Sequence, residues 1–140
     1  MKTLVPKAKT IQRNWQLFDA KNQILGRLAV KIAECLMGKS KPYFTRNTDC
    51  GDYAVVINAK EILTTGKKEK QKKYYRHSGY PKGLKVTNLA QLRQEHPERI
   101  IFHAVSGMLP QNKLKDKMLT RLYIFSDANH PYSNKFGEKK

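Results

Sequence analysis

The segment best suited to binding another molecule spans residues 66–85. It carries eight Lys or Arg residues and a single acid, Glu69, which gives a net charge of +7, and three tyrosines, a histidine, three glycines and a proline lie between the charges. Lysines attract phosphates whatever the base sequence, and aromatic rings stack on unpaired bases. Glycine and proline let the backbone turn close to a sugar-phosphate chain. The composition predicts nucleic-acid binding; the alternative is a solvated loop whose lysines only maintain solubility.

Further basic residues lie outside this segment. Arg27 and Lys31 fall on the polar face of the helix predicted over 25–36. A second group of basic residues surrounds the helix predicted near 112–118: Lys113, Lys115, Lys117 and Arg121. Each is equally compatible with phosphate contact and with simple solvation. Together they favour a surface that meets phosphates from several directions, as a folded RNA presents them.

A catalytic alternative uses Asp49, Asp52 and His77, which could serve a metal-dependent RNA hydrolase. The segment 49–52 (DCGD) is also an ordinary turn, because Asp and Gly favour bent backbone. The pair Gly66-Lys67 is no P-loop, since Glu61 stands where that motif needs glycine. We therefore expect no enzymatic activity, no cofactor, no metal site and no small-molecule substrate.

The overall charge supports a polyanionic partner. The 140 residues contain 28 Lys or Arg and 11 Asp or Glu, a net charge of +17, with 39% hydrophobic residues. Such self-repulsion in a folded chain favours a partner that neutralises it. No apolar run has the length of a signal peptide or membrane span, and Cys35 and Cys50 form no ligand motif. We expect a soluble, unsecreted, intracellular protein with no membrane partner and two reduced, packed thiols.

The elements that position these residues follow from hydrophobic periodicity. Residues 15–19 (WQLFD) and 53–57 (YAVVI) read as strands, and apolar residues between them form one helical stripe over 25–36, ended by Gly38. This order predicts a βαβ unit with parallel strands. Shorter helices follow near residues 89–92, 97–109 and 112–118, and a last strand at 122–125. Gly107 inside the second of these helices predicts a contact that needs its small size.

We therefore expect one α/β domain over residues 1–140. A basic, extended arm covers about residues 1–13, and an irregular tail covers about residues 126–140. A non-specific polyanion or membrane-surface binder is a third functional alternative. It is disfavoured because no predicted helix joins a basic face to a bulky aromatic one.

The sequence also contains a series of short motifs in a fixed order. They are W-x-x-x-D-A at 15–20, L-G-R-L-A at 25–29, D-x-G-D at 49–52, V-V-I-N-A at 55–59, T-G-K-K at 65–68, Y-Y-R-H-S-G-Y-P at 74–81, G-M-L-P-x-N at 107–112 and H-P at 130–131. In this order and spacing the chain resembles the universal thirteenth large-subunit ribosomal protein family, in its bacterial or organellar form.

The resemblance implies a three-layer α/β/α fold on a small, mainly parallel sheet of about four strands. It implies a structural constituent of the large ribosomal subunit, located in a cytoplasmic or organellar ribosome. Such a protein binds large-subunit rRNA early in assembly, beside neighbouring ribosomal proteins. With the charges of the basic segment, it predicts these rRNA-binding residues: Lys67, Lys68, Lys70, Lys72, Lys73, Tyr74, Tyr75, Arg76, His77, Ser78, Gly79, Tyr80, Lys82, Arg27, Asn112 and Lys113.

The chain departs from the family pattern at a few positions. Lys82 replaces the first glycine of a Gly-Gly pair, and Arg46 stands where proline is frequent. Lys115 and Asp116 stand where a Gly-Arg pair is common. The end after Pro131 lacks the usual Gln-Pro, so no contact is transferred beyond His130.

Overall fold

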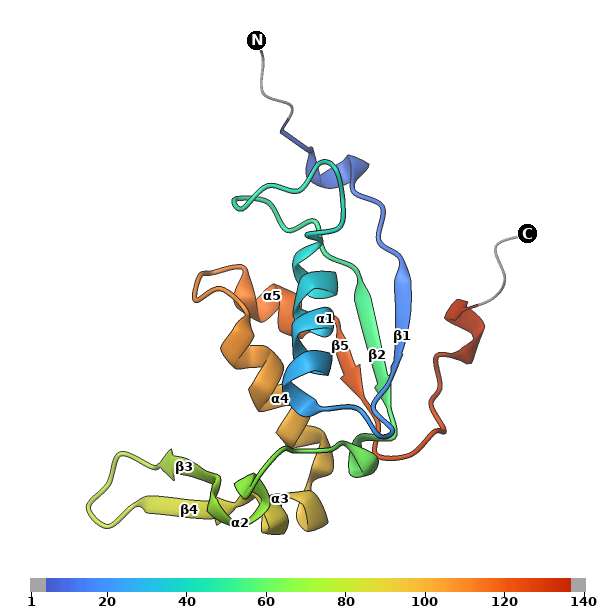
Figure 1. Ribbon diagram of the computed structural model, residues 1–140. Coiled ribbons are helices and arrows are strands. Elements are labelled where there is room, and N and C mark those ends of the chain that lie inside the picture. Colours follow the sequence, from blue (N-terminus) through green and yellow to red (C-terminus); the bar gives the residue numbers. More distant parts are fainter. Residues whose placement is uncertain (1–4, 137–140) are drawn as a thin grey trace.

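The computed structural model describes residues 5–136, and its centre is a three-stranded parallel sheet (Figure 1). Strand β1 (Trp15–Asp19) pairs with β2 (Tyr53–Ile57), and β5 (Leu122–Ile124) pairs with the other side of β2. Helix α1 (Leu25–Met37) connects β1 to β2. The predicted βαβ unit and its parallel strands are therefore confirmed.

Helix α1 forms because its apolar residues share one face. The buried residues are Leu25, Leu28, Ala29, Ile32, Ala33, Cys35 and Leu36, which include the whole predicted stripe. Gly38 ends the helix in the left-handed conformation at φ +76°, as predicted. A Cβ there would lie 2.6 Å from the Cys50 carbonyl oxygen, so the position needs glycine for space as well as for conformation.

Three more helices follow along the chain in the expected order: α3 (Leu89–Glu95), α4 (Pro97–Met108) and α5 (Lys115–Leu119). Helix α4 begins at Pro97 and packs Ile100, Ile101 and Val105 into the core with α1. The expectation for Gly107 is wrong within the described residues, because a Cβ there would meet nothing within 4 Å. Both cysteines are buried and unpaired.

The remaining strands do not extend the central sheet. Strands β3 (Lys73–His77) and β4 (Leu84–Asn88) form a separate antiparallel hairpin, preceded by the short helix α2 (Lys68–Gln71). In Figure 1 this hairpin projects from one end of the molecule. The fold is α/β, but its main sheet has three strands rather than about four. The basic, tyrosine-rich segment carries too few apolar residues to be covered on both faces of that sheet.

The helices α1, α4 and α5 cover one face of the sheet, and the C-terminal segment lies across the other (Figure 1). That second face is aromatic: the Trp15 ring stacks on Tyr53 at 4.3 Å and on Tyr132 at 5.1 Å between centroids. Tyr132 belongs to the predicted tail, whose described part also forms the 3-10 turn η3 (Ser133–Phe136). Aromatic packing from this segment, rather than a second layer of long helices, covers that face. The outermost residues of the predicted arm and tail, 1–4 and 137–140, lie outside the described residues.

Candidate nucleic-acid interface

The predicted binding segment folds as one structural unit, here called the basic hairpin and defined as residues 67–88. Its turn is closed by two hydrogen bonds, from the Ser78 N–H to the Gly83 carbonyl at 3.2 Å and from the Gly83 N–H to the Tyr80 carbonyl at 3.0 Å. A Cβ on Gly83 would lie 2.8 Å from the Tyr80 carbonyl oxygen and 2.0 Å from the Ser78 hydroxyl oxygen. The tight turn therefore requires glycine at this position.

Lys82 adopts φ +60°, a conformation that favours glycine. A non-glycine residue in this region costs about 1–2 kcal/mol. The turn nevertheless closes, and Lys82 adds a cation at its exposed tip.

The two faces of the hairpin differ because side chains alternate along each strand. Tyr74, paired with Thr87, points toward the helices and packs against the core. Burial raises the pKa of its phenol. Tyr75 lies on the other face and is 67% exposed, and Tyr80 in the turn is 75% exposed. Tyr75 and Tyr80, but not Tyr74, offer open rings for stacking.

The single acid of the segment, Glu69, is bound by Arg93 and Thr64. The Glu69 carboxylate accepts hydrogen bonds from Arg93 at 2.8 and 3.1 Å and from the Thr64 hydroxyl at 3.0 Å. These Arg93 hydrogen bonds lower the pKa of Glu69 against the opposing effect of burial. The same guanidinium donates to the carbonyls of Lys60 and Ile62. Arg93 thus anchors the start of the hairpin to the domain, a role for which the sequence carries no local signal.

The cations of the hairpin are exposed, and none forms an ion pair with another residue in 5–136. These cations are Lys67, Lys68, Lys70, Lys72, Lys73, Arg76, Lys82 and Lys85. His77, Ser78 and Gly79 are also exposed at the turn, where the Gly79 N–H donates to His77 Nδ1 at 2.9 Å. The structure therefore gathers the predicted residues of the segment on one projecting element, with Tyr74 turned inward.

The other predicted residues lie elsewhere. Arg27 is exposed in the first turn of α1, the turn whose Leu25 N–H donates to the Leu63 carbonyl at 2.9 Å. Asn112 and Lys113 are exposed in the connection after α4. Helix α4 is about 18 Å long and begins beside the hairpin, so these two residues lie far from it. The Asn112 amide oxygen accepts the Leu114 N–H at 3.1 Å. Asn112 also lines a hollow of about 330 Å³ with Lys39 and Arg46.

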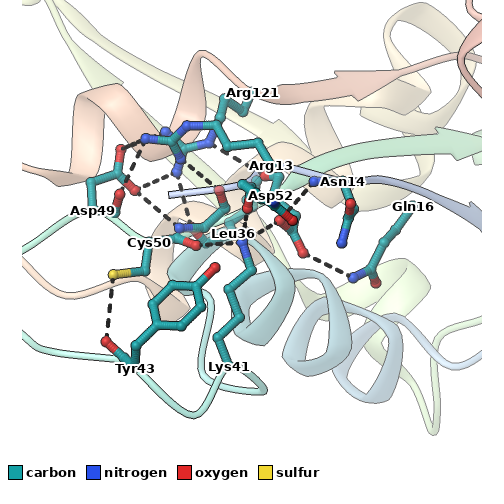
Figure 2. A network of polar contacts seen from close by, with 12 residues as sticks. Arg13, Asn14, Gln16, Leu36, Lys41, Tyr43, Asp49, Cys50, Asp52 and Arg121 are labelled. Atoms are coloured by element: carbon teal, nitrogen blue, oxygen red, sulfur yellow. Dashed lines mark hydrogen bonds and ion pairs between the residues drawn. The ribbon is translucent and has the colours of Figure 1, made fainter. Parts of the chain in front are cut away.

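The two aspartates of the catalytic alternative are committed to ion pairs (Figure 2). The Arg121 guanidinium donates to both carboxylate oxygens of Asp49 at 2.5 and 2.6 Å. Burial alone would raise the pKa of Asp49, but the hydrogen bonds and charge of Arg121 outweigh it and lower the pKa. Asp52 pairs with Lys41 at 2.5 Å and accepts the Asn14 N–H at 3.0 Å. Both carboxylates therefore hold the loop before β2 in place.

This network corrects the interpretation of Arg121 as a surface cation. The Arg121 side chain is 8% exposed and also donates to the Leu36 carbonyl at 3.0 Å. Its pairing partner lies 72 residues away in the sequence, so charge and helical position could not reveal the burial.

His77 lies on the hairpin, at the opposite end of the molecule from the loop that holds Asp49 (Figure 1). Across residues 5–136 no group of three or more His, Cys, Asp and Glu side chains is arranged to hold a metal. The geometry therefore does not bring together the three residues of the catalytic alternative. Within the same described range, no helix has the length and apolarity needed to cross a membrane.

Comparison with known proteins agrees with the motif order. The profile of the family described as ribosomal protein L13 matches residues 13–131. The large ribosomal subunit protein uL13 of Herpetosiphon aurantiacus is 48% identical over 134 residues, which cover 96% of this chain and 93% of that protein. The uL13 of Desulfitobacterium hafniense is 50% identical over 132 residues, with 94% and 92% covered. The uL13 of Thermotoga petrophila is 48% identical over 131 residues, with 94% and 88% covered.

The family profile covers the central sheet, the helices α1 to α5, the basic hairpin and the paired Asp49 and Asp52, and it ends just before Tyr132 and η3. The similarity to full-length relatives leaves only short stretches of either chain unmatched. The chain therefore belongs to the ribosomal protein L13 family.

Proposed function

We propose that this chain binds large-subunit rRNA with the basic hairpin as its principal contact. Membership of the family makes it a structural, non-enzymatic protein of the large ribosomal subunit, associated with rRNA and with other ribosomal proteins. Within that role, the exposed cations and tyrosines of the hairpin would be the groups that contact the RNA.

The proposal rests on a difference between two groups of cations in residues 5–136, those that form ion pairs within the domain and those of the hairpin, which do not. Among the described residues, the ion-paired cations, such as Arg93, Arg121 and Lys41, stabilise the domain, whereas the hairpin cations have no carboxylate partner. Glu69, the acid nearest to them in sequence, is held by Arg93. A projecting element with unpaired cations and the open rings of Tyr75 and Tyr80 suits a partner that offers both phosphates and unpaired bases.

The remaining assignments complete the proposal. Arg27 would contact RNA near the base of the hairpin, and Asn112 with Lys113 would contact a second RNA segment beyond the far end of α4. The whole chain, 1–140, would act as one domain with the arm at about 1–13 and the tail at about 126–140. Contacts with two RNA segments would support folding of the rRNA early in subunit assembly.

A salt titration tests the hairpin assignment. Binding of deproteinised large-subunit rRNA would be measured by filter retention between about 50 and 200 mM salt, where each phosphate contact contributes about 0.7–0.9 to the log–log slope. Replacing Lys70, Lys72 and Lys73 with Gln should make the slope shallower by about 2–3. A matched triple variant of Lys21, Lys60 and Lys135, which lie outside the hairpin, should leave the slope nearly unchanged.

Equal slopes for the two triple variants would contradict the hairpin assignment, because net charge alone would then set the affinity. Equal binding of heparin, anionic vesicles and unrelated RNA by the wild-type protein would instead favour the non-specific polyanion binder. Metal-dependent turnover of RNA, lost in Asp52→Ala, would restore the catalytic alternative.

A further inference from the structure

A groove lies between the basic hairpin and helix α4. It has a volume of about 510 Å³, and its lining includes Tyr74 and Arg76 from β3 and Arg99, Phe102 and His103 from α4. This volume falls within the range of about 300–1,000 Å³ that is usual for small-ligand sites. The groove is therefore large enough to receive one planar group of nucleotide size.

Two periodicities bring these five side chains together. Tyr74 and Arg76 are two residues apart on β3 and share the face of the hairpin that is turned toward the helices. Arg99, Phe102 and His103 are spaced by three and four residues and share one face of α4. The core face of α4 is separate and presents Ile100, Ile101 and Val105. One face of α4 therefore packs in the core, and another face lines the groove.

The groove presents three rings at its wall. The Tyr74 and His103 rings lie 5.4 Å apart with an interplanar angle of 31°, and the Phe102 ring meets His103 edge-on at 6.3 Å and 76°. Phe102 is 39% exposed and lines the groove, so part of its ring is accessible there. Burial and the nearby Arg99 lower the pKa of His103, so the imidazole adds an uncharged ring at neutral pH. An exposed ring such as that of Phe102 can accept any base by stacking.

The positive charge of the groove favours an anionic ligand. Arg76 and Arg99 stand at it without an ion-pair partner among the described residues, and no Asp or Glu lines it. An apolar peptide would leave both guanidinium groups without an anion. A nucleotide matches both features, because its base can stack on the rings while its phosphates meet the arginines.

We propose that this groove binds a single unpaired base of the rRNA, stacked on Phe102, with the adjoining phosphates paired to Arg76 and Arg99. The inference rests on the proposed function and deepens it, since it assigns RNA contact to α4, outside every predicted site residue except those of β3. A closed duplex cannot supply such a base, so the groove would select a bulged or looped nucleotide.

Phe102→Ala tests the stacking. Its affinity for deproteinised large-subunit rRNA should fall by about 5- to 150-fold, with the salt slope unchanged because no charge is removed. Met108→Ala is the matched control, because Met108 is 41% exposed on the same helix and does not line the groove. Urea unfolding of both variants would show that each is folded. Phe102→Leu, which keeps apolar bulk but loses the ring, should bind as weakly as Phe102→Ala.

Phe102→Trp provides a direct optical signal. The introduced indole should be quenched when deproteinised large-subunit rRNA binds and remain unquenched with a fully paired RNA duplex, after subtraction of the signal from Trp15 in the wild-type protein. Wild-type affinity in Phe102→Ala, full affinity in Phe102→Leu, or equal quenching by the duplex would each overturn the base-binding groove. Loss of rRNA binding by the wild-type protein itself would instead refute the proposed function.

Discussion

Tyr74 and Tyr75 are neighbours in the sequence and have opposite environments in the structure. The Tyr74 ring packs against the core and lies 5.4 Å from His103, whereas Tyr75 is 67% exposed on the outer face of the hairpin. The motif that contains them predicts RNA contact for both. Strand alternation separates them, because only one of two consecutive side chains can point toward the helices.

Alanine substitutions should separate the two roles. Tyr75→Ala should weaken binding of large-subunit rRNA by about 1–3 kcal/mol, the usual value for a stacked ring, with little change in the free energy of unfolding. Tyr74→Ala should lower the free energy of unfolding by about 2–4 kcal/mol, since it removes a large, partly buried ring. Filter binding and urea unfolding measure the two quantities. A loss of stability in Tyr75→Ala with unchanged affinity would reverse the assignment.

At the scale of elements, one ion-pair network joins segments that are distant in the chain. Arg121, just before β5, pairs with Asp49 in the loop before β2 and donates to the Leu36 carbonyl near the end of α1. Arg13, just before β1, donates to the Gly51 carbonyl at 2.5 Å. Figure 2 shows these groups converging on the loop. The network explains how a loop without helix or strand keeps one conformation beside the sheet.

Breaking this network should be strongly destabilising. Arg121→Met leaves Asp49 buried without its main partner, and loss of one member of a buried pair costs about 3–5 kcal/mol. Lys21→Met is the control, because Lys21 and Glu61 form an exposed pair at 3.7 Å whose loss should cost less than about 1 kcal/mol. Urea unfolding at pH 7 measures both free energies. Equal, small losses would show that the Asp49–Arg121 pair does not contribute.

The same pair should make stability depend on acid. The pKa of Asp49 is lowered in the folded protein, so its contribution is present above the ordinary value of 3.8 and is lost as pH falls below it. Asp49→Asn lacks this titration. The difference in free energy of unfolding between wild type and Asp49→Asn should therefore narrow from pH 6 to pH 3. A constant difference across this range would contradict the role of the Asp49 charge.

For the whole molecule, the C-terminal segment completes the packing of the sheet. Trp15, the single tryptophan, is covered by Tyr132 and contacted edge-on by Phe136 at 6.5 Å between centroids. Long helices occupy the opposite face. The described tail therefore contributes to the fold as well as to the surface.

Removing residues 129–140 should expose Trp15 to water. Its fluorescence maximum should shift to longer wavelength and the free energy of unfolding should fall, while rRNA binding through the hairpin should persist. Tyr132→Ala, which removes one ring of the cluster, should give a smaller shift in the same direction. An unchanged emission maximum in the truncated protein would show that the tail does not shield the tryptophan.

The elements themselves were largely predictable from local pattern. The strands at 15–19 and 53–57 and the helix ended by Gly38 are confirmed with nearly the expected bounds. The sequence does not predict strands for the hairpin, because its Lys and Arg side chains replace the run of apolar residues that marks β2. The second face of the sheet was not predicted either, since its cover comes from aromatic residues near the end of the chain.

Local sequence pattern predicts the central strands and helices of the α/β domain, its family and the class of its partner. These properties depend on local periodicity, motif order and summed charge, all of which can be read along one chain. Which charges and rings are available to that partner depends on tertiary contacts. Arg121 forms an ion pair with an aspartate 72 residues away, and Glu69 forms one with Arg93. Tyr74 packs toward the core, and Phe102 and Arg99 line a groove beside the hairpin. Pairing between distant residues sets the burial and partner of each side chain, and no local pattern carries that information.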